Sequence, residues 1–240
     1  MKRFSLLAAM VSLLTMPACF LDDDFPHCVN GKGDRTTEVL DIPDFSGIEL
    51  NIHADVYIEQ GAQQRVEIKA QENIIDLLKR DVKGGIWEIE FDRCAYDFSD
   101  VEITITMPGV DLLRLSSSGN IIGGGFFDAN LLDLIITGSG DIELDVDATG
   151  IDATVSGSGD MRISGQTQTL DILISGSGDF EGFELEAENA DLTISGSGDI
   201  ECFVNGSMDV TISGSGDVFY KGNPAIDVGI SGSGKLVNAN

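Results

Sequence analysis

Apolar and polar residues alternate strictly along the second half of the chain, in segments separated by glycine-rich turns. Before each turn two apolar columns can be aligned, represented in one repeat by Leu192 and Ile194. After the turn the alternation continues, for example with Ile200 and Cys202. A period of two places successive side chains on opposite faces of a β-strand. The pattern therefore predicts one strand before each turn and one after it, each with one buried face.

The turns share the sequence Ser-Gly-Ser-Gly-Asp and recur every 18 to 21 residues. A degenerate copy begins at Ser116, and the final copy, at Ser231, ends in Lys235. The regular copies begin at Thr137, Ser156, Ser175, Ser195 and Ser213. A fixed period of this length is typical of a solenoid, in which each repeat buries its apolar face against its neighbours. We predict an all-β fold, a parallel β-solenoid with six or seven coils of about 18–21 residues.

The glycines of these turns are the predicted structural corners, because glycine adopts positive φ at a sharp turn without a Cβ clash. They are Gly138, Gly140, Gly157, Gly159, Gly176, Gly178, Gly196, Gly198, Gly214 and Gly216. The other connection of each repeat varies in sequence. It predicts a second, looser corner that absorbs the differences in repeat length.

The first half of the chain is less regular. Residues 36–110 predict short strands at 37–42, 47–51, 55–59, 65–70, 86–91 and 101–107. Residues 72–82 carry an amphipathic pattern that predicts a short helix. No linker sequence separates this half from the regular repeats at 111–236. We therefore expect one continuous solenoid body over residues 36–240.

The N-terminus resembles a bacterial lipoprotein signal. Residues 1–18 contain a basic start, an apolar run and a small residue before Cys19, which would be lipidated. Ordinary cleavage, with Cys19 as a plain thiol, is the alternative. Residues 19–35 form an acidic tether like those of surface lipoproteins in Bacteroidetes-like bacteria. The segment predicts attachment to the outer membrane through an N-terminal lipid, at the cell surface or, alternatively, on the periplasmic face.

The charge balance narrows the range of partners. The chain has 41 acidic and 14 basic residues, a formal net charge of −27. Such a surface repels nucleic acid, so we expect no nucleic-acid partner. Cys28 and Cys94 could form a disulfide in an oxidising compartment, or remain two free thiols. Cys202 alternates with apolar residues and is expected to be buried.

Two columns of aspartates recur with the repeat. One column follows the glycine pairs and consists of Asp141, Asp160, Asp179, Asp199 and Asp217. The other precedes the turns and consists of Asp133, Asp152, Asp171, Asp191, Asp209 and Asp227. Carboxylates one strand apart repel unless they are compensated. Hydrogen bonding within the turns is the preferred explanation, and a row of Ca²⁺ sites is the alternative. We otherwise expect no cofactor.

Nothing in the pattern indicates an active site. The two histidines, His27 and His53, lie outside the regular repeats, and no nucleophile elbow is present. Arg114 and Arg162 are the basic candidates for polysaccharide cleavage, but 48 residues separate them. We predict that the protein is not an enzyme.

Three segments resemble the head GIN domain family, described as autotransporter adhesins. They are residues 45–50, 55–61 and 66–70, and the later strands and Ser-Gly-Ser-Gly-Asp turns continue the resemblance over about residues 36–236. The resemblance implies a right-handed parallel β-helix and a role in adhesion. We expect a surface adhesin that binds glycan or matrix-protein ligands. The alternative is a structural envelope module that forms homo-oligomers through an open C-terminal solenoid edge.

Overall fold

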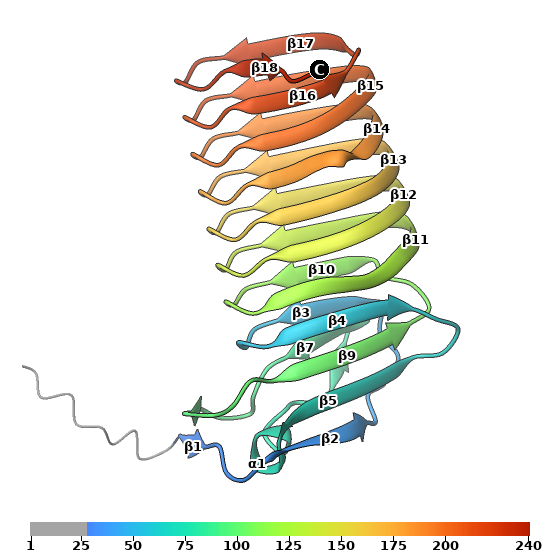
Figure 1. Ribbon diagram of the computed structural model, residues 1–240, viewed down its shortest axis with the longest axis vertical. Helices are drawn as coiled ribbons and strands as arrows, with labels where there is room; N and C mark the ends of the chain where they lie inside the picture. The colour runs from blue at the N-terminus through green and yellow to red at the C-terminus, as the bar shows by residue number, and fades with distance from the viewer. Residues whose placement is uncertain (1–27) are drawn as a thin grey trace, which may run out of the picture.

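The computed structural model describes residues 28–240, which form an elongated stack of β-coils (Figure 1). The fold is nearly all-β, with 62% strand, 2% helix and a solenoid of about 7 turns of about 19 residues each. The predicted fold class is therefore confirmed. The predicted signal peptide, the predicted lipidation site Cys19 and residues 19–27 of the predicted tether lie outside the described residues. Within residues 28–240, no helix is long and apolar enough to cross a membrane.

The regular coils are built from parallel strands. These are β10 (Leu112–Leu115), β11 (Asn120–Ile136), β12 (Ile142–Val155), β13 (Met161–Ile174), β14 (Phe180–Ile194), β15 (Ile200–Ile212), β16 (Val218–Gly222), β17 (Ala225–Ile230) and β18 (Leu236–Asn238). Strands β11 to β15 are long and bend once, where two strands and a looser corner were predicted. For β11 to β15 the prediction of a break was wrong, because the pairing of β12 with β13 continues through the bend, from Asp145↔Ser164 to Ala148↔Thr167. In the last described coil the predicted break is present, between β16 and β17.

Equivalent positions of successive regular coils stack in register over most of their length. Leu134, Ala153 and Ile172 pair in one column, and each is at most 3% exposed. The twenty-residue coil is accommodated by a shift between β13 and β14, where Arg162 and Ser164 pair with Glu181 and Glu184. The variable connection therefore absorbs repeat length, as expected, but does so as a bulge within a strand.

The glycine corners are required for a different reason from the one predicted. None of the corner glycines has positive φ. Instead, a Cβ added to Gly159 would collide with the carbonyl oxygen of Gly140 in the preceding coil, and one on Gly178 would collide with Gly159 in the same way. The corners stack so closely that backbone lies directly on backbone. Glycine is needed there for close approach between coils.

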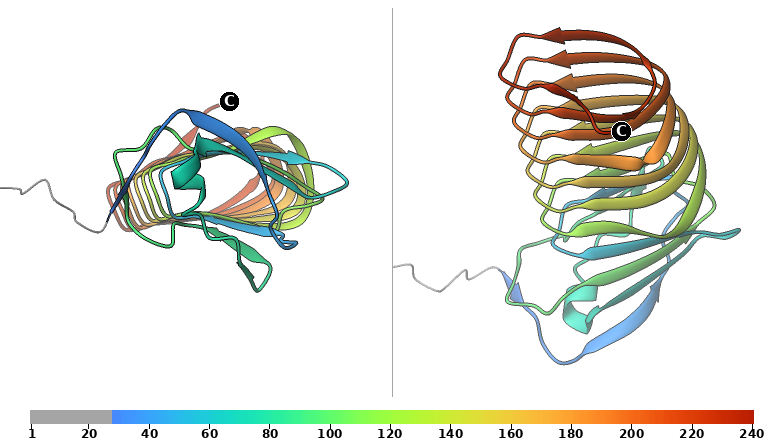
Figure 2. Two further views of the ribbon diagram at one scale, coloured as in Figure 1. Left: turned by 90° about the horizontal axis from the view of Figure 1, so that it is seen from below. Right: turned by 45° about the horizontal axis from the view of Figure 1, so that its top comes forward.

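The N-terminal half is less regular and includes antiparallel pairs. Its elements are β1 (Val29–Asn30), β2 (Arg35–Leu40), β3 (Gly47–Leu50), β4 (Asp55–Gln60), β5 (Arg65–Gln71), α1 (Glu72–Ile75), β6 (Val82–Lys83), β7 (Ile86–Ile89), β8 (Ala95–Tyr96) and β9 (Glu102–Met107). Strands β3 and β4 continue the parallel stack below β10 and β11. Strand β5 instead pairs antiparallel with both β2 and β9. In Figure 2, β2 and α1 lie across the lower end of the stack.

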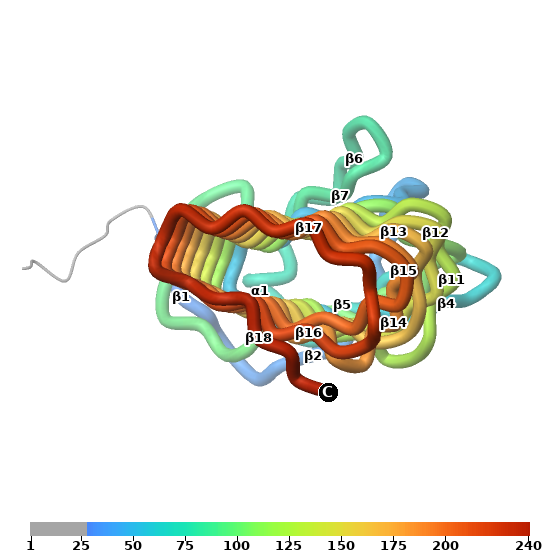
Figure 3. Tube along the Cα trace, turned by 90° about the horizontal axis from the view of Figure 1, so that it is seen from above, coloured from blue at the N-terminus to red at the C-terminus, as the bar shows by residue number. Residues whose placement is uncertain are grey.

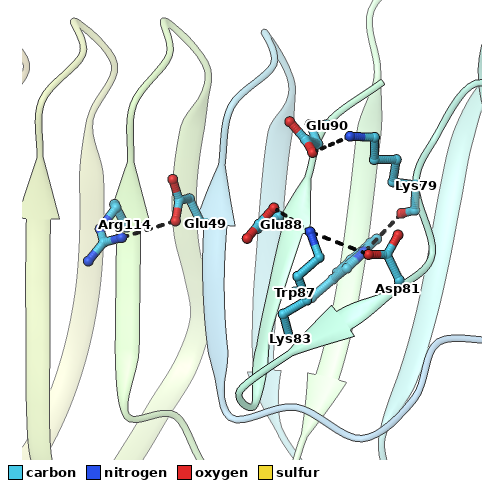
Figure 4. Close-up of polar contacts among 8 residues, drawn as sticks. All are labelled: Glu49, Lys79, Asp81, Lys83, Trp87, Glu88, Glu90 and Arg114. Atoms are coloured by element: carbon cyan, nitrogen blue, oxygen red, sulfur yellow. Dashed lines mark hydrogen bonds and ion pairs between the residues drawn. The ribbon is translucent and has the colours of Figure 1, made fainter. Parts of the chain in front are cut away.

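The helix predicted at 72–82 is mostly absent, since α1 ends at Ile75. Beyond it, Leu78 bridges to Phe91 and the Lys79 N–H donates to the Glu90 carbonyl. Tertiary pairing therefore replaces the helical hydrogen bonds. Trp87, which is fully buried, donates from Nε1 to the Lys79 carbonyl at 3.1 Å (Figure 4).

Ion pairs reinforce this lower end. Lys79 Nζ lies 2.6 Å from Glu90 Oε1, and Arg114 Nη1 lies 3.0 Å from Glu49 Oε2 (Figure 4). The hydrogen bond to Glu90 raises the pKa of Lys79. The predicted disulfide between Cys28 and Cys94 is present, and it fixes the start of the described chain beside β8. The described chain therefore begins at the lower end of the solenoid.

Candidate functional site: a polar trough and two aspartate columns

A polar trough with a volume of about 670 Å³ runs along the bend of β11 to β14. The bend lies at the end of each flattened coil opposite the glycine corners (Figure 3). Three consecutive residues from each of β11 to β14 line the trough, two of them outward and the middle one buried or half-buried, and β15 adds one. The lining residues are Asp128, Ala129, Asn130, Asp147, Ala148, Thr149, Gln166, Thr167, Gln168, Glu186, Ala187, Glu188 and Asn205. The trough therefore crosses several coils, parallel to the solenoid axis.

The floor of the trough is a column of small residues. Ala129, Ala148, Thr167 and Ala187 pair in register on successive strands. Longer side chains stand on both sides of this column, which leaves the surface hollow along the axis. The Thr167 hydroxyl donates to the Thr169 carbonyl at 2.9 Å, so the one polar floor group is already satisfied. The hollow follows from side-chain size.

The walls carry amide and carboxylate groups that are exposed to solvent. Gln166, Gln168 and Asn205 make no side-chain hydrogen bond to other described residues, so their amides are available to a ligand. The lower end is held by Gln60, which donates from Nε2 to the Asp128 carbonyl and accepts the Asp128 N–H. No Lys or Arg is among the lining residues described. The trough can both donate and accept hydrogen bonds, and its charge is negative.

The aspartates that follow the glycine corners form a hydrogen-bonded ladder. Asp199 Oδ1 accepts the Asp217 N–H at 2.7 Å, and Asp179 Oδ1 accepts the Asp199 N–H at the same distance. The same bond is repeated by Asp141, Asp160 and Asp217. The hydrogen bonding expected for these carboxylates is confirmed, although the donor belongs to the following coil. Each carboxylate thus joins two coils.

The degenerate first corner belongs to the same ladder. Asn120 Oδ1 accepts the Asp141 N–H at 3.1 Å, and Asn120 Nδ2 donates to Asp55 Oδ1 at 2.8 Å. An amide oxygen therefore does the work of the carboxylate at this position. Within residues 28–240, no three His, Cys, Asp or Glu side chains are grouped so that they could hold a metal ion.

The second aspartate column is not compensated in this way. Asp152, Asp171 and Asp191 are exposed and pair directly in register across β12, β13 and β14. Partial burial and then the charge of Asp152 raise the pKa of Asp171. The pKa of Asp133 is raised by the same two causes, while Arg114 opposes the shift. This face of the solenoid therefore carries a line of mutually repelling charges.

The two arginines considered for polysaccharide cleavage are engaged in ion pairs. Arg114 contacts Glu49, and Arg162 makes a bidentate contact to Glu181, with both N–O distances 2.8 Å. They lie on separate coils and do not converge on one site. Cys202 is fully buried, as expected, and burial raises its pKa to about 12.

The sequence predicted a looser second corner where the strands bend, but it did not single out the trough that lies along this bend. The signal lies in the spacing of Ala129, Ala148 and Ala187, which follow the repeat period between polar neighbours. A column of alanines between polar positions predicts a hollow once the strands are known to run through the bend.

Solved structures share this fold. A crystal structure titled as a "putative adhesin" from Bacteroides fragilis is 23% identical, with a TM-score of 0.83, and covers 88% of this chain and 99% of its own. One titled as a "putative lipid binding protein" from Parabacteroides distasonis is also 23% identical, with a TM-score of 0.75 and the same coverage. A "putative adhesin" from Parabacteroides merdae is 19% identical, with a TM-score of 0.71, and covers 88% of this chain and 100% of its own.

These identities establish similarity of fold alone. No curated protein matches the chain. The family model described as "Putative auto-transporter adhesin, head GIN domain" matches residues 44–224, which is most of the chain. The chain therefore belongs to the head GIN domain family.

Proposed function

We propose that the protein is an outer-membrane lipoprotein, attached through Cys19, that binds extended hydroxyl-rich ligands such as surface glycans in the polar trough. Membership of an adhesin family indicates a cell-surface or envelope location, and the family is not an enzyme family. The observation that carries the proposal is the set of unpaired amides, Gln166 and Gln168 on β13 and Asn205 on β15, in a hollow that crosses several coils.

The chemistry of the trough suits a sugar chain. Amide groups donate and accept hydrogen bonds, as sugar hydroxyls do. The strands repeat about every 4.8 Å, so similar polar groups recur along the axis and can contact successive units of one chain. Phe126, on β11, is 49% exposed on the same face as Asp128 and offers an apolar surface near the lower end. Many weak contacts of this kind add through multivalency.

A glycan and matrix-protein array tests this proposal. Soluble protein beginning at Asp22 is applied with and without Ca²⁺, beside the double variant Gln166→Ala, Gln168→Ala. We expect the double variant to lose at least about tenfold in affinity, since each lost hydrogen bond contributes about 1 kcal/mol. Thr211→Ala, an exposed change outside the trough, is the matched control. Ligands bound equally by all three proteins would place the binding site elsewhere.

The anchor is tested separately. Cys19→Ala should move the protein from the membrane fraction to the soluble fraction and abolish metabolic labelling with palmitate, because acyl chains hold a lipoprotein to the bilayer. Protease shaving of intact cells then distinguishes the cell surface from the periplasmic face. Full membrane retention of Cys19→Ala would contradict the proposed attachment.

A further inference from the structure

The last described coil exposes residues that are buried in every regular coil beneath it. Val228 is 45% exposed, whereas Val210, its partner in the coil below, is fully buried. The neighbouring inward residues Ile226 and Ile230 are 39% and 46% exposed. The right-hand view of Figure 2 shows this upper coil, with no strand above it within residues 28–240. Within the described residues, an apolar β-edge is therefore open at this end of the stack.

The backbone of β17 is also unpaired on its upper side. Strand β17 pairs with β15 in parallel, and the Ser231 N–H donates downward to the Ile212 carbonyl. Because the direction of these groups alternates along a strand, the N–H and C=O groups of Ile226, Val228 and Ile230 point away from β15. The same three residues thus supply both the exposed apolar side chains and the free backbone groups.

The opposite end of the solenoid cannot serve as the partner of this edge. There the parallel stack gives way to the antiparallel strands β2 and β5 and to α1, whose Ile74 and Ile75 are at most 1% exposed. A second copy could not continue the parallel stack from below. Head-to-tail growth into a filament is therefore unfavourable, and the edge of a second copy that matches β17 is its own β17.

Antiparallel pairing of two β17 strands has one register that satisfies all of these groups. Centred on Val228, it places Val228 opposite its own copy and Ile226 opposite Ile230. Directly opposed residues of this kind exchange both backbone hydrogen bonds. It also places Asp227 opposite Gly229. A shift of the pairing by two residues in one direction would instead place Asp227 against Asp227, and like charges directly opposite each other destabilise a sheet.

Gly229 supports this register independently. Its φ is not in the left-handed region, and a Cβ added to it would meet no atom within 4 Å. In the coils below, the same column holds the larger residues Thr193 and Thr211. The fold of a single copy therefore gives no reason for glycine at this position. In the proposed pair, Gly229 lies opposite Asp227 of the second copy, where the absence of a side chain avoids both a steric clash and a second charge.

We infer that two copies associate head to head through β17, in a two-fold dimer whose strands pair antiparallel about Val228. The interface is isologous, so it closes as a dimer and leaves no free edge of this type. Because β1 lies at the far end of each solenoid (Figure 1), the two N-termini point in opposite directions. If the attachment at Cys19 holds, as proposed above, the dimer joins two membranes, so that a second copy is itself a ligand of the adhesin.

Sedimentation equilibrium of the soluble chain beginning at Asp22, over a wide concentration range, tests the dimer without the anchor or the trough. We expect a reversible monomer–dimer equilibrium. Val228→Pro removes an upward N–H that no contact within one copy uses, and proline is tolerated on edge strands. This variant should stay monomeric at every concentration while its melting temperature is nearly unchanged.

The charge at position 229 gives a second test that does not depend on proline. Gly229→Lys places a cation opposite Asp227 and should tighten the dimer by at least about threefold, whereas Gly229→Asp should weaken it by at least about threefold. Lysine ordinarily blocks edge association, so tightening is specific to this register. Thr211→Asp and Thr211→Lys, in the same column one coil lower, are the controls and should change little. A monomer throughout, or equal dimers of both Gly229 variants, would overturn the inference.

Discussion

Replacing a corner glycine with alanine should destabilise the solenoid far more than the same change in an open position. In Gly198→Ala the new Cβ would collide with the carbonyl oxygen of Gly178, and it would also lie 3.2 Å from Ile174 Cγ2. Both neighbours are backbone or buried side chain, so neither can move aside freely. The coils must separate locally at this corner.

The cost can be worked from the contacts that hold the corner. The Ser197 N–H donates to the Gly176 carbonyl at 2.9 Å, and the Asp199 N–H donates to Asp179 Oδ1 at 2.7 Å. Losing both hydrogen bonds lowers the free energy of unfolding by about 2 kcal/mol, and the overpacking lowers it by a further amount of about 1–3 kcal/mol. We expect a decrease in the free energy of unfolding of about 3–5 kcal/mol, measured by urea denaturation followed by circular dichroism.

Gly125→Ala is the matched control. No atom lies within 4 Å of its added Cβ, and its φ is not positive. Alanine there should be neutral or stabilise by about 0.5 kcal/mol, because it restricts the unfolded chain. If the Gly198 and Gly125 variants unfolded at the same urea concentration, close backbone contact would not be the reason for the corner glycines.

Three further changes test the assignment of faces and of the two aspartate columns. Ile194→Asp should unfold the solenoid, because it places an unpaired charge in a fully buried column. The outward change Thr193→Asp should lower the free energy of unfolding by about 1 kcal/mol or less. Equal melting temperatures of the two variants would refute the assigned register. Asp199→Asn should lower the free energy of unfolding by about 1 kcal/mol or less, because an amide oxygen already accepts the equivalent hydrogen bond at Asn120. Calorimetry in EDTA, Mg²⁺ and Ca²⁺ should show no stabilisation specific to Ca²⁺. An increase of several degrees in melting temperature with Ca²⁺ alone would favour a metal site. Asp171→Asn should stabilise by about 0.5 kcal/mol at pH 7 by removing like-charge repulsion. Since the pKa of Asp171 is raised in the folded state, its ionisation lowers stability as the pH rises from the unfolded pKa, about 3.9, through the folded pKa. Urea denaturation at pH 4 and pH 7 should show that Asp171→Asn stabilises less at pH 4. Equal stabilisation at both pH values would contradict charge repulsion as the cause.

The sequence was most informative where one local signal repeats. The alternation around Ile194 and the period of the turns predicted the buried columns, the coil length and the parallel stack, because each repeat reports the same environment. The Cys28–Cys94 pairing was foreseen as an option, since two cysteines outside the regular repeats suited an exported protein. In these places local preference and tertiary structure agree.

The predictions were wrong or incomplete where tertiary contacts decide the outcome. The segment after Ile75 bonds to the backbone at Glu90 and Phe91, just beyond β7, instead of continuing as a helix. The corner glycines were predicted at the correct positions but from positive φ, whereas they are needed for close contact between coils. The stacking of Gly159 on Gly140 cannot be seen in the sequence of one repeat. The trough was missed since its floor at Ala148 is defined only when several coils are superposed.

The ladder from each aspartate to the next coil makes the height of this protein a modular quantity. The Asp179 N–H donates to Asp160 as the Asp199 N–H donates to Asp179, so the corners of successive coils are joined in the same way. Removing residues 156–174 would bring equivalent corners together and shorten the rod by one strand spacing, about 4.8 Å. The residues at both ends of the solenoid would be unchanged. The length of the solenoid, from its lower end to its upper end, could thus change in whole steps of one coil without a change of sequence at either end.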